Sequence, residues 1–215
     1  MRILIVDDHA IVRQGLKSLI ESGGGMEVIG EAEDGLAAVR AAKELSPDVV
    51  IMDVTMPELN GVEATRQIRK HNPDIKVIIL SMHPDKNIVR ESLRAGAVGY
   101  VLKSYVFDEL RKALEAAAAN SYYLSPRITD AVVEDYVHGS PSQETSVSEE
   151  LTSMERQILQ LLGEGLTIKL IARRLHMSPK TIDARRRAIM HKLGVSSVAD
   201  LVKCAIREGL TSLDF

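Results

Sequence analysis

The chain has 215 residues, 45% hydrophobic and 27% charged, with a formal net charge of -3, which is typical of a globular protein of one or two domains. The single cysteine, Cys204, excludes an internal disulfide and a cysteine-based zinc site and favours a reducing cytoplasm. Only four apolar residues separate Arg2 from Asp7, too few for a signal peptide, and no apolar run reaches the length of a membrane span. We therefore expect a cytoplasmic protein with no membrane partner.

The charge is divided unequally along the chain. From Leu151 to Phe215 there are 11 Lys and Arg and 6 Asp and Glu, a balance of +5, whereas the preceding residues carry 16 and 24, a balance of -8. This division favours cation or phosphate chemistry in the first part and a polyanionic partner for the second.

Residues 1–120 alternate short apolar runs with stretches of helical spacing. Val49 to Met52 is an uninterrupted β-branched and apolar run, of the kind that a parallel sheet buries on both faces. Five such units predict an α/β, (βα)5 fold with a parallel, doubly wound sheet. The predicted strands are 3–6, 26–32, 49–53, 76–81 and 99–102, and the predicted helices are 11–20, 36–45, 62–70, 88–95 and 108–119. Gly23 to Gly25 form a turn without the pattern of a phosphate loop, so nucleotide binding has no support there.

Polar residues stand where several of these strands end. Asp53 ends the third strand, Asp7 and Asp8 follow the first, Ser81 ends the fourth and Lys103 follows the fifth. In open α/β sheets the carboxyl ends of the strands line the ligand crevice, so these side chains are expected to converge. Three carboxylates at about 4 to 6 Å repel by roughly 4 kcal/mol per pair at an effective dielectric near 20, which calls for a divalent cation and a compensating lysine. Oxygen ligands favour Mg²⁺ or Mn²⁺.

Each of these residues also has a structural interpretation. A single aspartate after a strand is usually a helix cap or turn residue, and for Asp7 or Asp8 alone the two interpretations are evenly balanced. Convergence with Asp53 and Lys103 favours the functional one. His9 lies in a loop beside carboxylates, where a histidine is more often a surface residue than a metal ligand.

These motifs resemble the receiver domain of bacterial two-component response regulators over about residues 1 to 120. The resemblance rests on Asp7-Asp8, Met52-Asp-Val-Thr-Met-Pro57 with Asn60-Gly61, Ser81, and Gly99-Tyr-Val-Leu-Lys103. It implies a flavodoxin-like sheet of strand order 2-1-3-4-5, in which Asp53 accepts a phosphoryl group from a sensor histidine kinase.

The resemblance also implies a role for each residue of the site. Asp8, Asp53 and the backbone carbonyl of Thr55 would bind Mg²⁺, with Asp7 helping through water. Lys103 would pair with the phosphoryl oxygens, Ser81 would hydrogen-bond to one of them, and Tyr100 would be the aromatic side chain that moves with Ser81. Many receivers have a cis proline after the lysine, whereas Ser104 stands here, and a cis bond before a non-proline residue costs about 3 kcal/mol. The geometry of the Lys103–Ser104 bond is thus left open.

A tether separates the two parts of the chain. Residues 126–138 have the apolar spacing of one helix, and residues 139–150 are rich in Ser, Pro, Gln, Thr and Glu, a composition that cannot bury a core. The predicted domains are therefore 1–122, a linker helix and flexible tether over 123–148, and 149–215.

The last 65 residues have the pattern of four helices. The first begins with the capping-box spacing Thr152-Ser-Met-Glu155, the second spans residues 168–175 and the fourth spans 198–207. The third opens at Ser178-Pro179 and carries the run Arg185 to Arg187. Two short helices joined by a turn, the second rich in arginine, predict an all-α helix-turn-helix domain that binds double-stranded DNA. A solvated basic face is the alternative, and the proline-capped helix and the charge of +5 favour DNA.

This part resembles the LuxR-type four-helix module, and with the receiver it resembles a NarL/FixJ-family regulator over nearly the whole chain. The match is carried by Leu151-Thr-Ser-Met-Glu-Arg-Gln-Ile-Leu159, Gly165-Leu-Thr-Ile-Lys-Leu-Ile-Ala172, Ser178-Pro-Lys-Thr-Ile182 and Lys192-Leu-Gly-Val195. The resemblance implies a homodimer when phosphorylated, with RNA polymerase as a further candidate partner. By the same resemblance Asp183, Ala184 and Arg187 would face base edges, and Lys180, Thr181, Arg185 and Arg186 would mainly hold phosphates.

Two residues depart from the usual pattern of this module. Asp183 is an unusual carboxylate for a helix on DNA, although it can accept a hydrogen bond from cytosine N4. Leu170 replaces the usual glutamate three residues after the cap Thr167, so the reciprocal half of that capping box is absent and the helix is expected to fray more easily.

Two other functions remain open at this point. In a Mg²⁺-dependent phosphohydrolase Asp53 would be the nucleophile, but the general acid of the Asp-x-Asp pair is replaced by Thr55, so turnover should be poor and we do not expect an enzyme. The other alternative is a DNA-binding protein whose receiver is a dimerisation scaffold that is never phosphorylated. The complete set of Asp7, Asp8, Asp53, Ser81 and Lys103 argues against it, and a phosphorylation assay decides.

Overall fold

The structure is a computed structural model that describes residues 1–22, 24–82, 84–138 and 151–211. The chain divides into two compact units, Met1–Pro141 and Ser142–Phe215. The flexible tether predicted from residue 139 onward lies outside the described residues. Within the described ranges no helix combines the length and hydropathy needed to cross a membrane.

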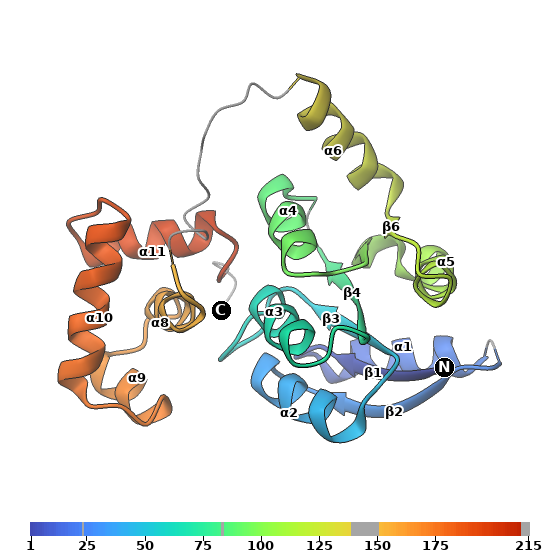
Figure 1. Ribbon diagram of the computed structural model, residues 1–215, viewed down its shortest axis with the longest axis horizontal. Helices are drawn as coiled ribbons and strands as arrows, with labels where there is room; N and C mark the ends of the chain where they lie inside the picture. The colour runs from blue at the N-terminus through green and yellow to red at the C-terminus, as the bar shows by residue number, and fades with distance from the viewer. Residues whose placement is uncertain (23, 83, 139–150, 212–215) are drawn as a thin grey trace. The chain divides into compact units, whose positions relative to one another are not determined.

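The first unit is built on a parallel six-stranded sheet with helices on both faces (Figure 1). The strands lie in the order β2-β1-β3-β4-β5-β6, and every neighbouring pair is parallel, which confirms the predicted doubly wound, flavodoxin-like fold. The strands are β1 (Arg2–Val6), β2 (Glu27–Ala32), β3 (Val49–Asp53), β4 (Lys76–Ser81), β5 (Gly99–Leu102) and β6 (Tyr123–Leu124). The helices are α1 (Ala10–Ser22), α2 (Gly35–Leu45), α3 (Gly61–His71), α4 (Lys86–Arg94), the 3-10 turn η1 (Lys103–Tyr105), α5 (Val106–Ala118) and α6 (Pro126–His138).

The strand side chains alternate between two cores. In β4, Ile79 points into a core shared with α2, α3, α4 and α6, whereas Ile78 and Leu80 point into a core shared with α1 and α5. Because both faces are covered, the central strands carry apolar residues at almost every position, and β3 is buried along its whole length. This burial holds the strand ends, and the polar residues on them, in fixed positions.

The sheet has one strand more than the sequence pattern predicted. Tyr123 and Leu124 form β6, which pairs with Gly99 and Tyr100 of β5. The helix predicted over residues 126–138 is present as α6, and its Ile128 is completely buried in the core that also contains Tyr100. The segment after α5 therefore packs on the receiver sheet and belongs to the first unit.

The second unit contains four described helices, α8 (Ser153–Gly163), α9 (Ile168–Arg174), α10 (Pro179–Lys192) and α11 (Val198–Arg207). Thr152 and Glu155 form the predicted capping box at α8, and Ser178 caps α10 with Pro179 in its first turn. Ile182 and Ile189, seven residues apart on α10, are fully buried against apolar residues of α8, α9 and α11. The opposite side of α10 is therefore left facing outward.

Candidate functional site

The carboxylates that follow β1 and β3 meet a lysine at the carboxyl edge of the sheet. Asp7 is completely buried and Asp53 is only 5% exposed. Lys103, at the end of β5, reaches both carboxylates: its Nζ lies 2.7 Å from Oδ2 of Asp7 and 2.9 Å from Oδ2 of Asp53. The structure therefore brings three of the residues predicted at the strand ends into one ion-pair network.

Burial dominates the electrostatics of Asp53. It raises the pKa of Asp53 from 3.8 to about 6; Lys103 opposes this change, and Asp7 and Asp8 add to it. For Lys103 burial lowers the pKa, but attraction by Asp53 and Asp7 outweighs burial, so the net shift is upward. Lys103 thus stays charged, and the buried carboxylates retain an excess of negative charge that a cation can neutralise.

The loop after Asp53 is held by backbone contacts. The Val54 N–H donates to the Leu80 carbonyl at 3.0 Å, and the Gly61 N–H donates to the Val54 carbonyl at 2.9 Å. Asn60 caps α3 by accepting from the Glu63 N–H at 2.9 Å. Thr55 is exposed between these anchored residues. Within the described ranges no peptide bond is cis, so the bond after Lys103 is trans.

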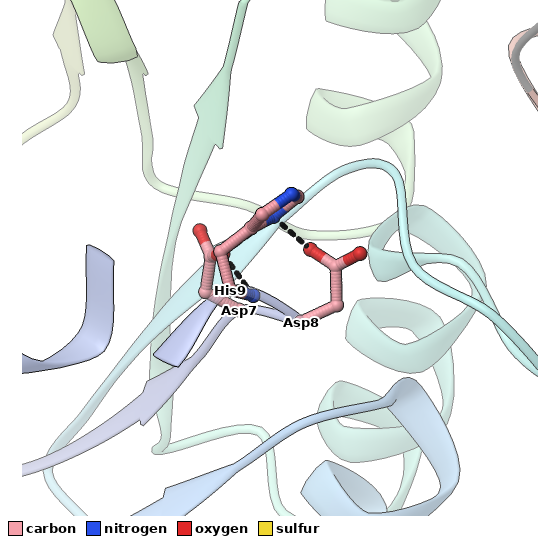
Figure 2. Close-up of side chains that lie close together, drawn as sticks. All are labelled: Asp7, Asp8 and His9. Carbon is pink, nitrogen blue, oxygen red and sulfur yellow. Dashed lines mark hydrogen bonds and ion pairs between the residues drawn. The ribbon is translucent and has the colours of Figure 1, made fainter. Parts of the chain in front are cut away.

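Asp8 and His9 follow Asp7 in the chain and are exposed, and Figure 2 shows the three side chains close together. The His9 N–H donates to Oδ1 of Asp7 at 2.9 Å, and His9 Nδ1 lies 2.7 Å from Oδ1 of Asp8. Both side chains reach solvent, with 67% of His9 and 32% of Asp8 exposed, whereas Asp7 is enclosed. Asp7, Asp8 and His9 offer ligand atoms that all lie within 4.8 Å of one another. An accessible carboxylate beside buried ones suits a hydrated, oxygen-preferring cation such as Mg²⁺.

Ser81 and Tyr100 adjoin the site from β4 and β5. Ser81 is 4% exposed and Tyr100 is completely buried. Burial raises the pKa of Tyr100 to about 12, and the side chain of Ser81 opposes this shift. The two residues that the resemblance pairs as a switch therefore lie close enough to influence one another.

Arg13 is a residue that the sequence reasoning did not single out. Its Nη1 donates to the backbone carbonyl of Asp7 at 2.8 Å, and its Nε lies 3.1 Å from Oε2 of Glu31. Arg13 thus ties the loop between β1 and α1 to β2. The helical spacing of α1 marked only its apolar positions, so it carried no signal for this contact.

The residues predicted to contact DNA lie along α10. Lys180, Thr181, Ala184 and Arg187 are exposed. Their neighbours Asp183, Arg185 and Arg186 are partly exposed, so all seven residues lie outside the core of the second unit. The end of α10 is linked to α8 by an ion pair, in which Lys192 Nζ lies 2.7 Å from Oε2 of Glu155.

Asp183 is paired within its own helix. Its Oδ1 accepts from Nη2 of Arg186 at 2.8 Å, and its Oδ2 lies 3.1 Å from Nη2 of Arg187. The negative charge of this residue is therefore compensated on the helix itself. Cytosine recognition by Asp183 stays a prediction, as do the other contacts to DNA.

Two family models match the chain. Residues 3–115 match the response regulator receiver domain, and residues 149–205 match the bacterial regulatory proteins of the luxR family. The two matches fall in the first and second compact units, respectively.

Similar proteins match this chain over nearly the whole of their own length. The transcriptional regulatory protein YdfI of Bacillus subtilis (strain 168) is 37% identical, with 99% of each chain covered. A LuxR-family two-component response regulator from Aurantimonas sp. SI85-9A1 is 42% identical with a TM-score of 0.61, and the match covers 63% of this chain and 97% of that one. RcsB from Salmonella enterica serovar Typhimurium, bound to promoter rprA in the presence of phosphomimetic BeF3-, is 28% identical with a TM-score of 0.58, covering 95% and 97%.

Proposed function

Because the chain belongs to the bacterial two-component response regulators that join a receiver domain to a LuxR-type helix-turn-helix domain, we propose that phosphorylation of Asp53 controls its binding to DNA. The observation that carries this proposal is the contact of one lysine, Lys103, with two buried carboxylates at the carboxyl edge of the sheet. The family regulates transcription, and we assign this chain no turnover of other substrates.

The reaction that fits this geometry is phosphoryl transfer to Asp53 from a phosphohistidine of a sensor kinase. A carboxylate oxygen of Asp53 forms a bond to phosphorus, the bond from phosphorus to the histidine nitrogen breaks, and the imidazole leaves with the electron pair. Lys103 is placed to follow the new negative charge, because its Nζ already contacts Asp53. Ser81, at the end of the adjacent strand, is placed to donate its hydroxyl to a phosphoryl oxygen.

The donor set fits a magnesium ion. Asp8, Asp53 and the carbonyl of Thr55 would hold the ion, and Asp7 would contribute through water. When bound, Mg²⁺ neutralises the charge of the transferring phosphoryl group. The raised pKa of Asp53 supports this assignment, because burial and the neighbouring carboxylates make its ionised form costly without a cation.

The proposed output is cooperative binding of two copies to double-stranded DNA. The side of α10 that faces outward carries Lys180, Arg185 and Arg187, which suits a polyanion. One short helix makes few phosphate contacts, so two linked copies on adjacent half-sites would bind far more tightly than one. We further propose that the protein is cytoplasmic and forms a homodimer when phosphorylated. Its proposed partners are a sensor kinase and, as a further candidate, RNA polymerase.

The test compares the full-length protein and Asp53→Asn, each with and without acetyl phosphate and Mg²⁺. Intact mass measures phosphorylation, sedimentation measures the oligomeric state, and binding to a DNA site selected from a random library measures the output at fixed salt. We expect the donor to add one phosphoryl group, raise the sedimenting mass and tighten binding. Asp53→Asn should show none of these changes. A mutant that still gains a phosphoryl group, or a wild type whose DNA affinity ignores phosphorylation, would contradict the proposal.

A further inference from the structure

Ser125 lies at the point where β6 ends and α6 begins, next to the end of β5. Its N–H donates to the Tyr100 carbonyl at 2.9 Å, which continues the pairing of β6 with β5. Its own carbonyl turns away from the sheet and accepts from the N–H groups of Ile128 and Thr129 at 2.8 and 3.0 Å, in the first turn of α6. The backbone N–H of Ser125 is therefore hydrogen-bonded to the sheet, and its carbonyl is hydrogen-bonded to α6.

Because the carbonyl of Ser125 bonds to α6, it does not accept from β5, and the side chain of Ser125 accepts instead. Its Oγ accepts from the Leu102 N–H at 3.1 Å, and the hydroxyl donates to the carboxylate of Glu109 on α5. Ser125 is 1% exposed and Leu102 is 3% exposed, so water cannot readily replace this contact. We call Ser125, Glu109 and the Leu102 amide the Ser125 joint.

The Ser125 joint holds the residue that precedes Lys103. Two contacts from the start of α6 flank Lys103. Ser125, directly before α6, binds the Leu102 amide on one side, and the guanidinium of Arg127 in α6 lies 5.3 Å from the ring centre of Tyr105 on the other. Ile128 of α6 also belongs to the buried cluster that contains Tyr100 and Leu102. A displacement of Lys103 therefore affects the nearby residues Leu102 and Tyr105, which contact Ser125 and Arg127.

We propose that the Ser125 joint couples the phosphorylation site to α6, the helix that precedes the DNA-binding unit in the chain. This inference rests on the proposed function, because it takes phosphorylation of Asp53 as the input. A phosphoryl group on Asp53 draws Lys103 toward its oxygens, and the backbone of Leu102 follows. When the hydrogen bonds of the Ser125 joint are present, the movement of Leu102 displaces the start of α6. When they are absent, Leu102 can move while α6 stays in place.

The experiment compares full-length wild type, Ser125→Ala, Ser125→Thr and Thr129→Ala. Alanine removes the hydroxyl of the joint, and threonine keeps it. Thr129→Ala is the matched control, because it removes a hydroxyl from the same helix that makes only long contacts of 3.4 Å to the Leu124 and Ser125 carbonyls. For each protein, intact mass measures phosphorylation by acetyl phosphate with Mg²⁺. The ratio of DNA affinities with and without the donor measures coupling.

We expect Ser125→Ala to accept the phosphoryl group but to lose about fivefold or more of the donor-dependent gain in DNA affinity. Ser125→Thr and Thr129→Ala should keep the gain. Hydrogen exchange gives a second readout: the donor should change protection in peptides from α6 of the wild type but not of Ser125→Ala, whereas the response near Ser81 should persist in both. Arg127→Ala, at an exposed position, tests the second anchor and should lose part of the gain even if Ser125→Ala folds poorly.

The inference is overturned if phosphorylated Ser125→Ala gains as much affinity as the wild type, or if Thr129→Ala loses as much as Ser125→Ala. A wild type that is phosphorylated without any gain in affinity would instead overturn the proposed function. The two failures are thus distinguished by the behaviour of the wild type.

Discussion

Gly61 packs directly against Asp53: a Cβ atom added to Gly61 would lie 1.8 Å from the backbone carbonyl oxygen of Asp53. Because the obstacle is backbone rather than a flexible side chain, Gly61→Ala must displace the end of β3 or the start of α3. We expect the free energy of unfolding of the receiver unit to fall by about 3 kcal/mol, at the upper end of overpacking effects. Urea unfolding followed by circular dichroism measures this change.

Gly15→Ala is the matched control for that substitution. Gly15 lies within α1, and a Cβ added there meets no atom within 4 Å. Since alanine favours helix by about 1 kcal/mol over glycine, this variant should be as stable as the wild type or more stable. Equal losses in both variants would show that the contact with Asp53 is unimportant.

The pKa of Asp53 predicts a pH dependence of stability. Its folded-state pKa is about 6, against 3.8 ordinarily, so the folded state binds its proton more tightly than the unfolded chain does. The free energy of unfolding should therefore fall as pH rises from about 4 to about 6, by up to about 3 kcal/mol from this group. Asp53→Asn removes the titrating group and should be the more stable protein at pH 7. Urea unfolding in the presence of a chelator, between pH 4 and 7, gives the free energy of unfolding of the wild type and of Asp53→Asn. If the two proteins showed the same dependence of this free energy on pH, the prediction would be refuted.

Lys103 should oppose metal binding at the same site. Its Nζ contacts Asp7 and Asp53, so Lys103→Met leaves both carboxylates without their cation. We expect Mg²⁺ to bind at least about tenfold more tightly to this variant, because a like charge close to the ion has been removed. Titration calorimetry gives the affinity. Lys76→Met is the control, because Lys76 begins β4 and so lies at the end of that strand away from the site. This variant should bind Mg²⁺ like the wild type.

Asp183 should influence how selectively α10 binds DNA. Its carboxylate pairs with Arg186 and Arg187, and we expect it to hold the Arg187 guanidinium in one orientation. Asp183→Ala should strengthen binding to random DNA, because a negative charge is lost, and should lower the preference for the selected site by about 1 kcal/mol. Competition binding at fixed salt measures both effects. Asp200→Ala removes a carboxylate from α11 and should leave the preference unchanged; an equal loss there would exclude a specific role for Asp183.

The sheet and its polar edge could be predicted because the relevant signals are local. The run before Asp53 is apolar for four residues, three of them β-branched, and its length and composition alone indicate a buried parallel strand. Once the strands were located, topology brought Asp7 and Lys103 to the same edge. The convergence of Asp7, Asp53 and Lys103 followed from the direction of the strands.

The sixth strand and the Ser125 joint could not be predicted in this way. Tyr123 and Leu124 are too few to show alternation, and their pairing with β5 depends on contacts across more than twenty residues of chain. Ser125 before Pro126 suggests only a helix cap in the sequence. Its bond to the Leu102 amide depends on the path of the backbone after β6, which residue type does not specify.

The brevity of β6 also bears on aggregation. A long, flat strand at the edge of a sheet presents unpaired N–H and C=O groups that can recruit a strand from another molecule. Here the exposed edge beyond β5 is two residues long and is followed at once by a serine, a proline and a helix, so it offers almost no template for such pairing. We therefore do not expect copies of this receiver to associate by backbone pairing at that edge.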